Sequence, residues 1–292
     1  MLQRKMEYKT ALVIDAGHEV SQWLSQILTL PEWVVREAPD NAAALELVKS
    51  TRFDLILTSE RSSGKEDVAL LRSIRRLHQH TRMIILTDDS TPGDVLEAMR
   101  EGAFSYFSHP FSRAVLADMV AIATQGPCWD DGVEVLSATP SWIRLLARCD
   151  MKTADRLVQF IREMTDLPEA EKDSVALALR ELLLNAIEYG ANFNPDQYVE
   201  MSYLRSKRAV TCRVKDPGEG FSFDEIQHAA VLNPADDPLR HLNYRAAGNL
   251  RAGGFGLLLA RQCVDELIYN DKGNEALLIK YVGSAVGQSS QG

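Results

Sequence analysis

The segment ALRELLLNAIEYG, residues 178–190, is the most informative stretch of this 292-residue chain. Apolar residues recur in it and just before it at helical spacing, which predicts one helix from about residue 169 to 189. Glu181, Asn185 and Glu188 fall at i, i+4 and i+7 on a neighbouring face. Three polar groups aligned on an otherwise apolar helix indicate either a solvated face or a functional site. The apolar stripe comprises Val175, Leu179, Leu182 and Ala186.

Two glycine-rich segments follow this helix. A strand hairpin, YVEMSYLR and AVTCRVKD, leads into DPGEGF, residues 216–221. Asp216 ends an alternating strand, so its carboxylate can face a pocket and accept a hydrogen bond from an amine. Gly218 and Gly220 allow a ligand to approach the backbone closely. The second segment, GGFGLLLARQCVDEL, opens a predicted helix whose bare N–H groups and positive dipole end suit phosphate. Its glycines are Gly253, Gly254 and Gly256.

Each of these motifs alone is weak, and a chance glycine-rich α+β domain is the alternative. In this order, ExxxN, DxGxG and GGxGL resemble the N, G1 and G2 boxes of the GHKL ATPase superfamily. The resemblance implies a two-layer α/β domain of the Bergerat ATP-binding type over residues 137–282. No GxxxxGK[ST] sequence of a Walker-type site occurs.

The resemblance also implies roles for these residues, with ATP and Mg²⁺ as cofactors. Asn185 would give its side-chain oxygen to Mg²⁺ that bridges the phosphates, and Asp216 would select adenine through its exocyclic amine. Glu181 would be the general base that takes a proton from a serine hydroxyl or a water. The glycines of both motifs would contact the nucleotide, and Glu188 has no role in the family pattern. A lid over the nucleotide would carry Arg240, Arg245 and Arg251, which are otherwise surface arginines.

The first half of the chain alternates short apolar strands with amphipathic helices. Five such units predict a doubly wound (βα)5 domain with a parallel sheet, and its ligand crevice lies at the carboxyl ends of the strands. The strands are expected in TALVID, WVVREA, DLILTS, MIILT and FSYFSHPF, and the helices in VSQWLSQIL, NAAALELVKS, DVALLRSIRRL, GDVLEAMREG and RAVLADMVAIA.

This half resembles the receiver domains of response regulators over about 115 residues. The family's acidic pair, phosphoacceptor Asp, Thr or Ser, and Lys before Pro correspond here to Asp15 with Ala16, Ser59, Thr87 and His109. Three of these five chemical positions have changed. An acyl phosphate needs a carboxylate nucleophile, a divalent cation held by more than one oxygen ligand, and a fixed positive charge. We therefore expect a degenerate, non-phosphorylatable pseudo-receiver that acts through protein contact.

Two of these positions have alternative interpretations. Ser59 either closes a pocket that no longer works or is phosphorylated by a separate serine kinase. His109 is either a structural loop histidine or a pH-sensitive element. Tyr106, which aligns with a mobile aromatic of many receivers, is interpreted as a half-buried strand residue.

The length of the chain limits the number of domains, and its composition argues against several classes of function. The length suits two domains, which we place at residues 1–126 and 137–282, with a linker at 127–136 and a flexible tail at 283–292. A net charge of −9 argues against a nucleic-acid surface. No apolar run is long enough to span a bilayer and no signal peptide begins the chain, so we expect a cytoplasmic protein. The four cysteines lie far apart, which argues against a metal or disulfide framework.

The type of GHKL protein follows from what surrounds the ATP motifs. Histidine kinases need a helical hairpin with a phosphorylatable His, and no His occurs between His109 and His228. The arrangement that remains resembles the anti-sigma factor serine/threonine kinases of bacterial partner switching. The resemblance implies a kinase that acts on an anti-sigma antagonist or binds a sigma factor or another kinase, and forms a homodimer. The alternatives are a nucleotide-gated module that sequesters a partner without phosphotransfer, and a working response regulator with ATPase output.

Overall fold

The computed structural model describes most of the chain as two compact units, Met1–Asp131 and Gly132–Gly292. The described residues are 8–15, 17–28, 32–58, 61–125, 132–221, 237, 240, 242–243 and 255–283.

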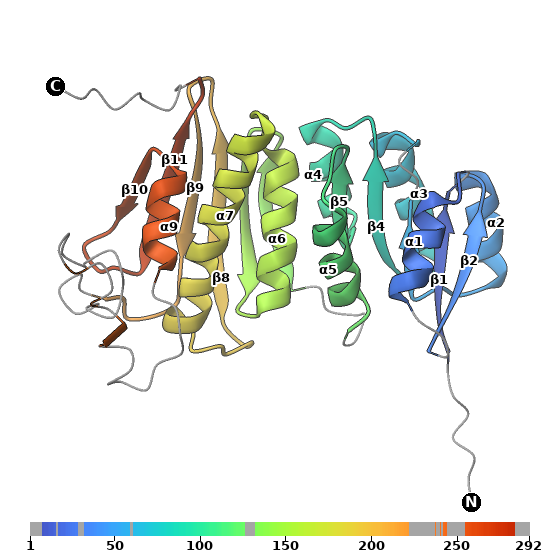
Figure 1. The fold of residues 1–292 in the computed structure, drawn as a ribbon, viewed down its shortest axis with the longest axis horizontal. Coiled ribbons are helices and arrows are strands. Elements are labelled where there is room, and N and C mark those ends of the chain that lie inside the picture. Colours follow the sequence, from blue (N-terminus) through green and yellow to red (C-terminus); the bar gives the residue numbers. More distant parts are fainter. Residues whose placement is uncertain are drawn as a thin grey trace, which may run out of the picture. The chain divides into compact units, whose positions relative to one another are not determined.

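The first unit contains a five-stranded sheet in the order β2-β1-β3-β4-β5 (Figure 1). All its strand pairs are parallel. This confirms the predicted doubly wound fold, because parallel neighbours in this order require a helical crossover after each strand. The elements are β1 (Lys9–Ile14), α1 (Glu19–Ile27), β2 (Trp33–Ala38), α2 (Asn41–Ser50), β3 (Leu55–Leu57), α3 (Gly64–Leu77), β4 (Arg82–Thr87), α4 (Pro92–Arg100), β5 (Ser105–Ser108) and α5 (Arg113–Ala123).

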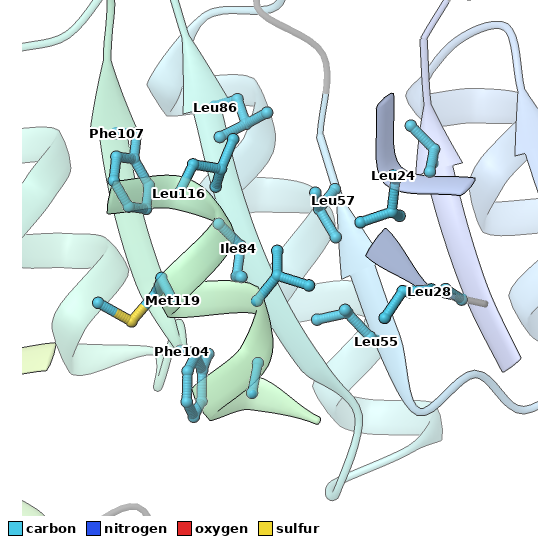
Figure 2. Packing of buried hydrophobic residues seen from close by; sticks show 14 of the residues in the cluster. Leu24, Leu28, Leu55, Leu57, Ile84, Leu86, Phe104, Phe107, Leu116 and Met119 are labelled. Carbon is cyan, nitrogen blue, oxygen red and sulfur yellow. The ribbon is translucent and has the colours of Figure 1, made fainter. Parts of the chain in front are cut away.

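Helices cover both faces of this sheet, which explains why every residue of the central strands β3 and β4 is buried. On one face α1 and α5 pack against the central strands; Figure 2 shows Leu24 of α1 and Leu116 of α5 in the same cluster as Leu57 and Leu86. Side chains of this cluster are at most 7% exposed. On the other face α3 contacts both α2 and α4.

The second unit contains a six-stranded sheet in the order β10-β11-β9-β8-β7-β6. All its strand pairs are antiparallel. The elements are β6 (Val133–Thr139), β7 (Trp142–Arg148), α6 (Met151–Met164), α7 (Glu169–Asn185), the π-helical turn η1 (Ala186–Gly190), β8 (Tyr198–Arg205), β9 (Ala209–Lys215), α9 (Gly256–Cys263), β10 (Glu266–Tyr269) and β11 (Glu275–Tyr281).

Helices α6, α7 and α9 lie side by side over one face of this sheet (Figure 1). The strands alternate buried and more exposed residues, as expected where a single face is covered. Leu157, Phe160 and Ile161 of α6 are at most 3% exposed, so the apolar face of this helix is buried. The architecture is the two-layer α/β arrangement that the sequence predicts.

The structure differs from the predicted boundaries at two places. Residues Val133–Leu136 of the predicted linker form the start of β6, which pairs with β7. The spacing of apolar residues does not predict this strand, because it lies at the edge of the sheet and none of its residues is buried. The predicted helix over residues 169–189 is α-helical only to Asn185 and continues as the π-helical turn.

Among the described residues, no helix combines the length and apolar character needed to cross a membrane.

Candidate functional site

Glu181 lies where helices α7 and α9 pack together. A Cβ on Gly256, the first residue of α9, would stand 3.5 Å from Glu181 Cδ and would meet Glu181 Oε2, so the Glu181 carboxylate lies directly against Gly256. The carboxylate of Glu181 is therefore beside the first turn of α9, where backbone N–H groups have no partner within the helix. An acidic group and an anion-binding helix terminus meet at this point.

Asn185 is the last residue of α7 and lies one turn after Glu181 on the same face. Its side chain is half-buried and does not cap the π-helical turn that follows. In that turn the N–H of Ala191 donates to the carbonyl of Ala186 at 3.0 Å. Glu188 lies within the turn, where the 3.6-residue period that aligned it with Glu181 no longer holds.

Asp216 follows β9 and is half-buried. Its Oδ1 accepts a hydrogen bond from the N–H of Gly218 at 2.8 Å. Burial raises the pKa of the Asp216 carboxyl above its ordinary value, while this hydrogen bond and the positive charge of Lys272 act in the opposite direction. Asp216 thus presents a fixed carboxylate in a partly desolvated position.

Two glycines, Gly190 and Gly218, fit closely around this carboxylate, and Gly220 lies further along the same loop. A Cβ on Gly190 would stand 2.5 Å from Asp216 Cγ, so the end of the π-helical turn packs directly on the acid. A Cβ on Gly218 would stand 2.8 Å from the Gly190 carbonyl oxygen. Gly220 has a φ of +83°, which favours glycine. The N-box helix and the DxGxG loop are therefore brought into contact, as the sequence motifs require.

Sequence reasoning expected the turn between β10 and β11, residues Asn270–Asn274, but not its contact with the loop that carries Asp216. The carbonyl of Asn274 accepts the backbone N–H of Asp216 at 3.0 Å, and Lys272 Nζ donates to the carbonyl of Gly218 at 3.3 Å. The only sequence signal was the NDKGN pattern, which predicts a turn but not its contact with a loop more than fifty residues away in the chain.

Two further side chains lie near Asp216. Burial, with the charge of Asp216, raises the pKa of the Cys149 thiol to about 11, so this cysteine stays protonated and inert. The same two causes raise the pKa of Tyr269, whose ring contacts that of Phe221 edge to face with centroids 5.4 Å apart. The Asp216 carboxylate thus lies near a buried thiol and an aromatic ring.

Some predicted residues lie outside the described part of the chain. These are Gly253, Gly254, Arg245 and Arg251. Arg240, the remaining lid arginine, is exposed, and its backbone N–H donates to the carbonyl of Asp237 at 3.2 Å.

The residues present fit a magnesium nucleotide. Where the chain is described, no group of three or more His, Cys, Asp or Glu side chains could hold a metal ion by itself. A cation held mainly by phosphate oxygens needs few protein ligands, and the Asn185 side-chain oxygen would be one of them. The carboxylate of Asp216 suits an exocyclic amine, and the start of α9 suits phosphate.

The carboxyl ends of the parallel strands in the first unit form a second polar site. Asp15, directly after β1, is buried, and its oxygens accept hydrogen bonds from the N–H groups of Gly17 at 2.9 Å and Val20 at 2.8 Å. Thr87 ends β4, and its hydroxyl contacts the carbonyl of Ser62 at 2.6 Å. Asp15 thus acts mainly as a cap for the start of α1.

Of the other residues predicted for this site, only some lie within the described residues. His109 is exposed, and its N–H donates to the carbonyl of Thr87 at 2.9 Å. Ala16 and Ser59 lie outside the described residues. Tyr106 is 0% exposed rather than half-buried, because its ring lies under α3 with the hydroxyl against Gly64.

Two arginines that sequence reasoning did not single out lie in this crevice. Arg61 and Arg113 line a cavity of about 120 Å³ together with Asp15 and Asp88. A Cβ on Gly17 would stand 3.2 Å from Arg61 Nη2 and 3.4 Å from Asp15 Oδ1. A guanidinium therefore lies close to Asp15, the one acid that remains of the family's acidic pair. Their positions after β3 and β5, at the carboxyl ends of the strands, were the available signal.

Comparisons with known proteins agree with this division. Residues 11–121 match the family model of the response regulator receiver domain, and residues 147–280 match that of the histidine kinase-like ATPase domain. The first match ends before, and the second begins after, the boundary between the compact units.

Individual relatives match the first unit. The response regulator protein PilR of Pseudomonas aeruginosa is 26% identical over 118 residues, which are 40% of this chain and 26% of the relative. The probable transcriptional regulatory protein NarL of Mycobacterium tuberculosis is 29% identical over 93 residues, 32% of this chain and 43% of the relative. The chain thus spans less than half the length of these curated relatives.

A solved signal receiver domain of an HD domain-containing protein from Pseudomonas fluorescens Pf-5 is 25% identical; the match covers 40% of this chain and 95% of that domain, with a TM-score of 0.36. The two family matches, with the fold and the geometry above, show that the chain joins a response regulator receiver domain to a histidine kinase-like ATPase domain of the GHKL type.

Proposed function

We propose that this protein is an ATP-dependent serine/threonine protein kinase of the anti-sigma type, which its receiver domain controls through protein contacts. A receiver domain fused to a histidine kinase-like ATPase domain fits a signalling regulator. The observation that supports kinase activity is the position of Glu181. Its carboxylate lies beside the first turn of α9, where phosphates would bind. A base at that point can reach a hydroxyl that attacks the terminal phosphate.

The chain's residues divide the reaction between them. Asp216 accepts a hydrogen bond from the adenine amine, and the start of α9 holds the phosphates. Asn185 would hold Mg²⁺, which when bound would neutralise charge on the phosphate oxygens. Glu181 takes the proton of a serine or threonine hydroxyl while that oxygen bonds to the γ-phosphorus. The bond from the γ-phosphorus to the bridging oxygen breaks, and ADP leaves with the electron pair.

We propose that the receiver domain works without an acyl phosphate. Asp15 accepts backbone N–H groups at the start of α1, and Arg61 lies beside it, which leaves a poor site for a hard divalent cation. The domain would then transmit its signal by binding a protein partner, such as an anti-sigma antagonist, a sigma factor or a kinase. We also propose a homodimer and no contact with nucleic acid or membrane.

Calorimetric titration with ATP and Mg²⁺ tests the nucleotide site. Saturable binding is expected for the wild type. Asp216→Asn should weaken binding about 10- to 100-fold, because a hydrogen bond to a charged group is lost. Asn185→Ala should weaken binding only in the presence of Mg²⁺. Asp118→Asn, which alters an exposed acid on α5, is the control and should bind like the wild type. No saturable binding by the wild type would overturn the proposal.

Phosphotransfer needs a separate measurement with Glu181→Gln. This variant should bind ATP normally but transfer phosphate to a captured partner protein about 100-fold more slowly or worse, because the base is missing. Mass spectrometry of the partner would locate the phosphate on a serine or threonine. Tight ATP binding that changes partner affinity, with no phosphoprotein formed, would instead support a nucleotide-gated binding module.

A further inference from the structure

The turn Asn270–Asn274 lies against the loop that carries Asp216, although these segments are far apart in the sequence. The Asn274 carbonyl accepts the Asp216 N–H at 3.0 Å, and Asn274 Nδ2 donates to the carbonyl of Gly218 at 3.3 Å. Gly218 in turn donates its N–H to Asp216 Oδ1 at 2.8 Å. Asn274 thus holds the loop on both sides of the acid, and a closed set of hydrogen bonds fixes the carboxylate.

Asn274 is itself held firmly. It is 7% exposed, and its Oδ1 accepts a hydrogen bond from Asn270 Nδ2 at 2.9 Å. Its backbone N–H donates to Asn270 Oδ1 at 3.1 Å, and the N–H of Glu275 donates to the same oxygen at 3.2 Å. Both polar atoms of the Asn274 side chain are therefore used, so the amide cannot turn without leaving a buried group unpaired.

The turn and the loop also pack without spare room. Gly220 has a φ of +83°, and a Cβ there would collide with the carbonyl of Lys272. Gly273 has a φ of +77°, and a Cβ there would collide with the backbone of Phe221. A displacement of the turn must therefore displace the loop, and the position of Asp216 depends on the turn.

We propose that Asn274 is a positioning residue that fixes the Asp216 carboxylate and thereby sets the preference of the site for adenine over guanine. The inference rests on the proposed ATP-binding function. An ionised carboxylate accepts a hydrogen bond from the 6-amino group of adenine and is repelled by the 6-carbonyl oxygen of guanine. This discrimination requires a fixed carboxylate, because a mobile one can turn away from the guanine oxygen.

Titrations of the full chain with ATP and GTP, both with Mg²⁺, test the proposal. Asn274→Ala should weaken ATP binding about fivefold to tenfold, the usual effect of losing a hydrogen bond to a partly buried partner. GTP binding should stay the same or strengthen, so the ratio of the two affinities should fall. Asn274→Asp has the same shape but cannot donate to the Gly218 carbonyl, and its ratio should fall as well.

Ser206→Ala is the matched control. Ser206 Oγ accepts the backbone N–H of Ala209 at 3.0 Å in the turn before β9, at the opposite end of that strand from Asp216. This variant loses a turn hydrogen bond but should keep the wild-type preference for ATP. Circular dichroism would show that each variant is folded, and the near-isosteric Asn274→Asp provides the test if Asn274→Ala unfolds.

The outcomes separate this inference from the proposed function. If the wild type binds neither nucleotide, the proposed function fails and the inference fails with it. If the wild type prefers ATP and a folded Asn274 variant keeps that preference, only the inference is overturned. An equal loss of ATP and GTP affinity would likewise overturn it, because Asn274 would then support the fold of the site without setting its selectivity.

Discussion

Asp67 is a residue whose environment conflicts with its charge. It lies in the first turn of α3, is 0% exposed, and its oxygens accept hydrogen bonds from Asn41 Nδ2 at 2.9 Å and Ser62 Oγ at 2.7 Å. Burial raises the pKa of Asp67 to about 6, against the hydrogen bonds from Asn41, Ser62 and Thr58 that lower it. The neighbouring charge of Glu66 raises it further. Burial thus destabilises the ionised form of Asp67 in the folded domain.

The receiver domain should therefore lose stability relative to the Asp67→Asn variant as the pH rises, because asparagine stays neutral where Asp67 ionises. The folded pKa exceeds the ordinary value, so the folded domain holds a proton that the unfolded chain releases. The stabilisation that this bound proton gives the folded domain is complete below about pH 4 and is lost as the pH rises through about 6. The total is on the order of 2–3 kcal/mol. Hydrogen exchange of peptides from residues 8–125, followed between pH 4 and 7.5, measures this.

The comparison with Asp67→Asn isolates this group from the other carboxylates. The difference in stability between wild type and variant should change with pH across that window. Asp118→Asn, an exposed acid on α5, should show a constant difference. A pH-independent difference for Asp67→Asn would mean that Asp67 ionises as an ordinary surface acid does.

Where α3 begins over β5, the two elements meet at Gly64 and Tyr106. A Cβ on Gly64 would collide with the Tyr106 hydroxyl, and Tyr106 is 0% exposed. Gly64→Ala should lower the unfolding free energy of the receiver domain by about 1–3 kcal/mol, because a packed core accepts added volume poorly. Thermal unfolding monitored by circular dichroism measures the loss.

Gly93→Ala is the matched control for that substitution. Gly93 lies in the first turn of α4, and a Cβ there would stand 3.4 Å from Thr91 Oγ1, an ordinary contact. Alanine is favoured over glycine in a helix by up to about 1 kcal/mol, so this variant should be as stable as the wild type or more so. If both variants behaved alike, the contact between Gly64 and Tyr106 would not limit the packing of α3.

The π-helical turn is the element that brings α7 to the DxGxG loop. A Cβ on Gly190 would stand 2.5 Å from Asp216 Cγ, so Gly190→Ala should displace the acid and weaken ATP binding about tenfold or more. In the background of Asp216→Gly, which removes the Asp216 Cβ and Cγ that the new Cβ would meet at 2.5 Å, Gly190→Ala should have little further effect on stability. Calorimetry and thermal unfolding of the four variants complete this double-mutant cycle. Additive effects on stability would contradict direct packing between the two residues.

Helices and strands that have a local spacing of apolar residues are predicted well from the sequence. Features that depend on contacts between distant parts of the chain are predicted less well. The strands of the receiver sheet and the helix carrying Glu181 follow from apolar spacing alone. The π-helical turn was missed because its residues continue the α-helical pattern, and β6 was missed because an edge strand needs no buried face. Asn274 was missed because its effect on Gly218 acts across 56 positions of the chain, and no local pattern records such a contact.

At the scale of the whole molecule, the two units differ in the phosphate chemistry that their residues support. In the ATPase domain, Glu181, Asn185 and Asp216 lie on α7 and at the end of β9, which η1 brings together. In the receiver domain, Asp15 bonds to backbone N–H groups and two arginines line the crevice. We therefore expect phosphate transfer in the second unit. We expect the first unit to regulate that reaction or to respond to it.

A comparison of phosphodonors tests this division of chemistry. The full chain, incubated with Mg²⁺ and a small acyl phosphate, should gain no phosphoryl group on any peptide from residues 8–125, because the chain has Ser59 in place of the acid and a guanidinium beside Asp15. A receiver domain with an intact acidic pair and phosphoacceptor Asp should be labelled under the same conditions and serves as the positive control. The triple variant Ala16→Asp, Ser59→Asp and His109→Lys should acquire an acid-stable, base-labile label only if Arg61 is also replaced, because its charge competes with the metal. Labelling of the wild-type receiver peptides would show that the domain retains a working phosphoacceptor.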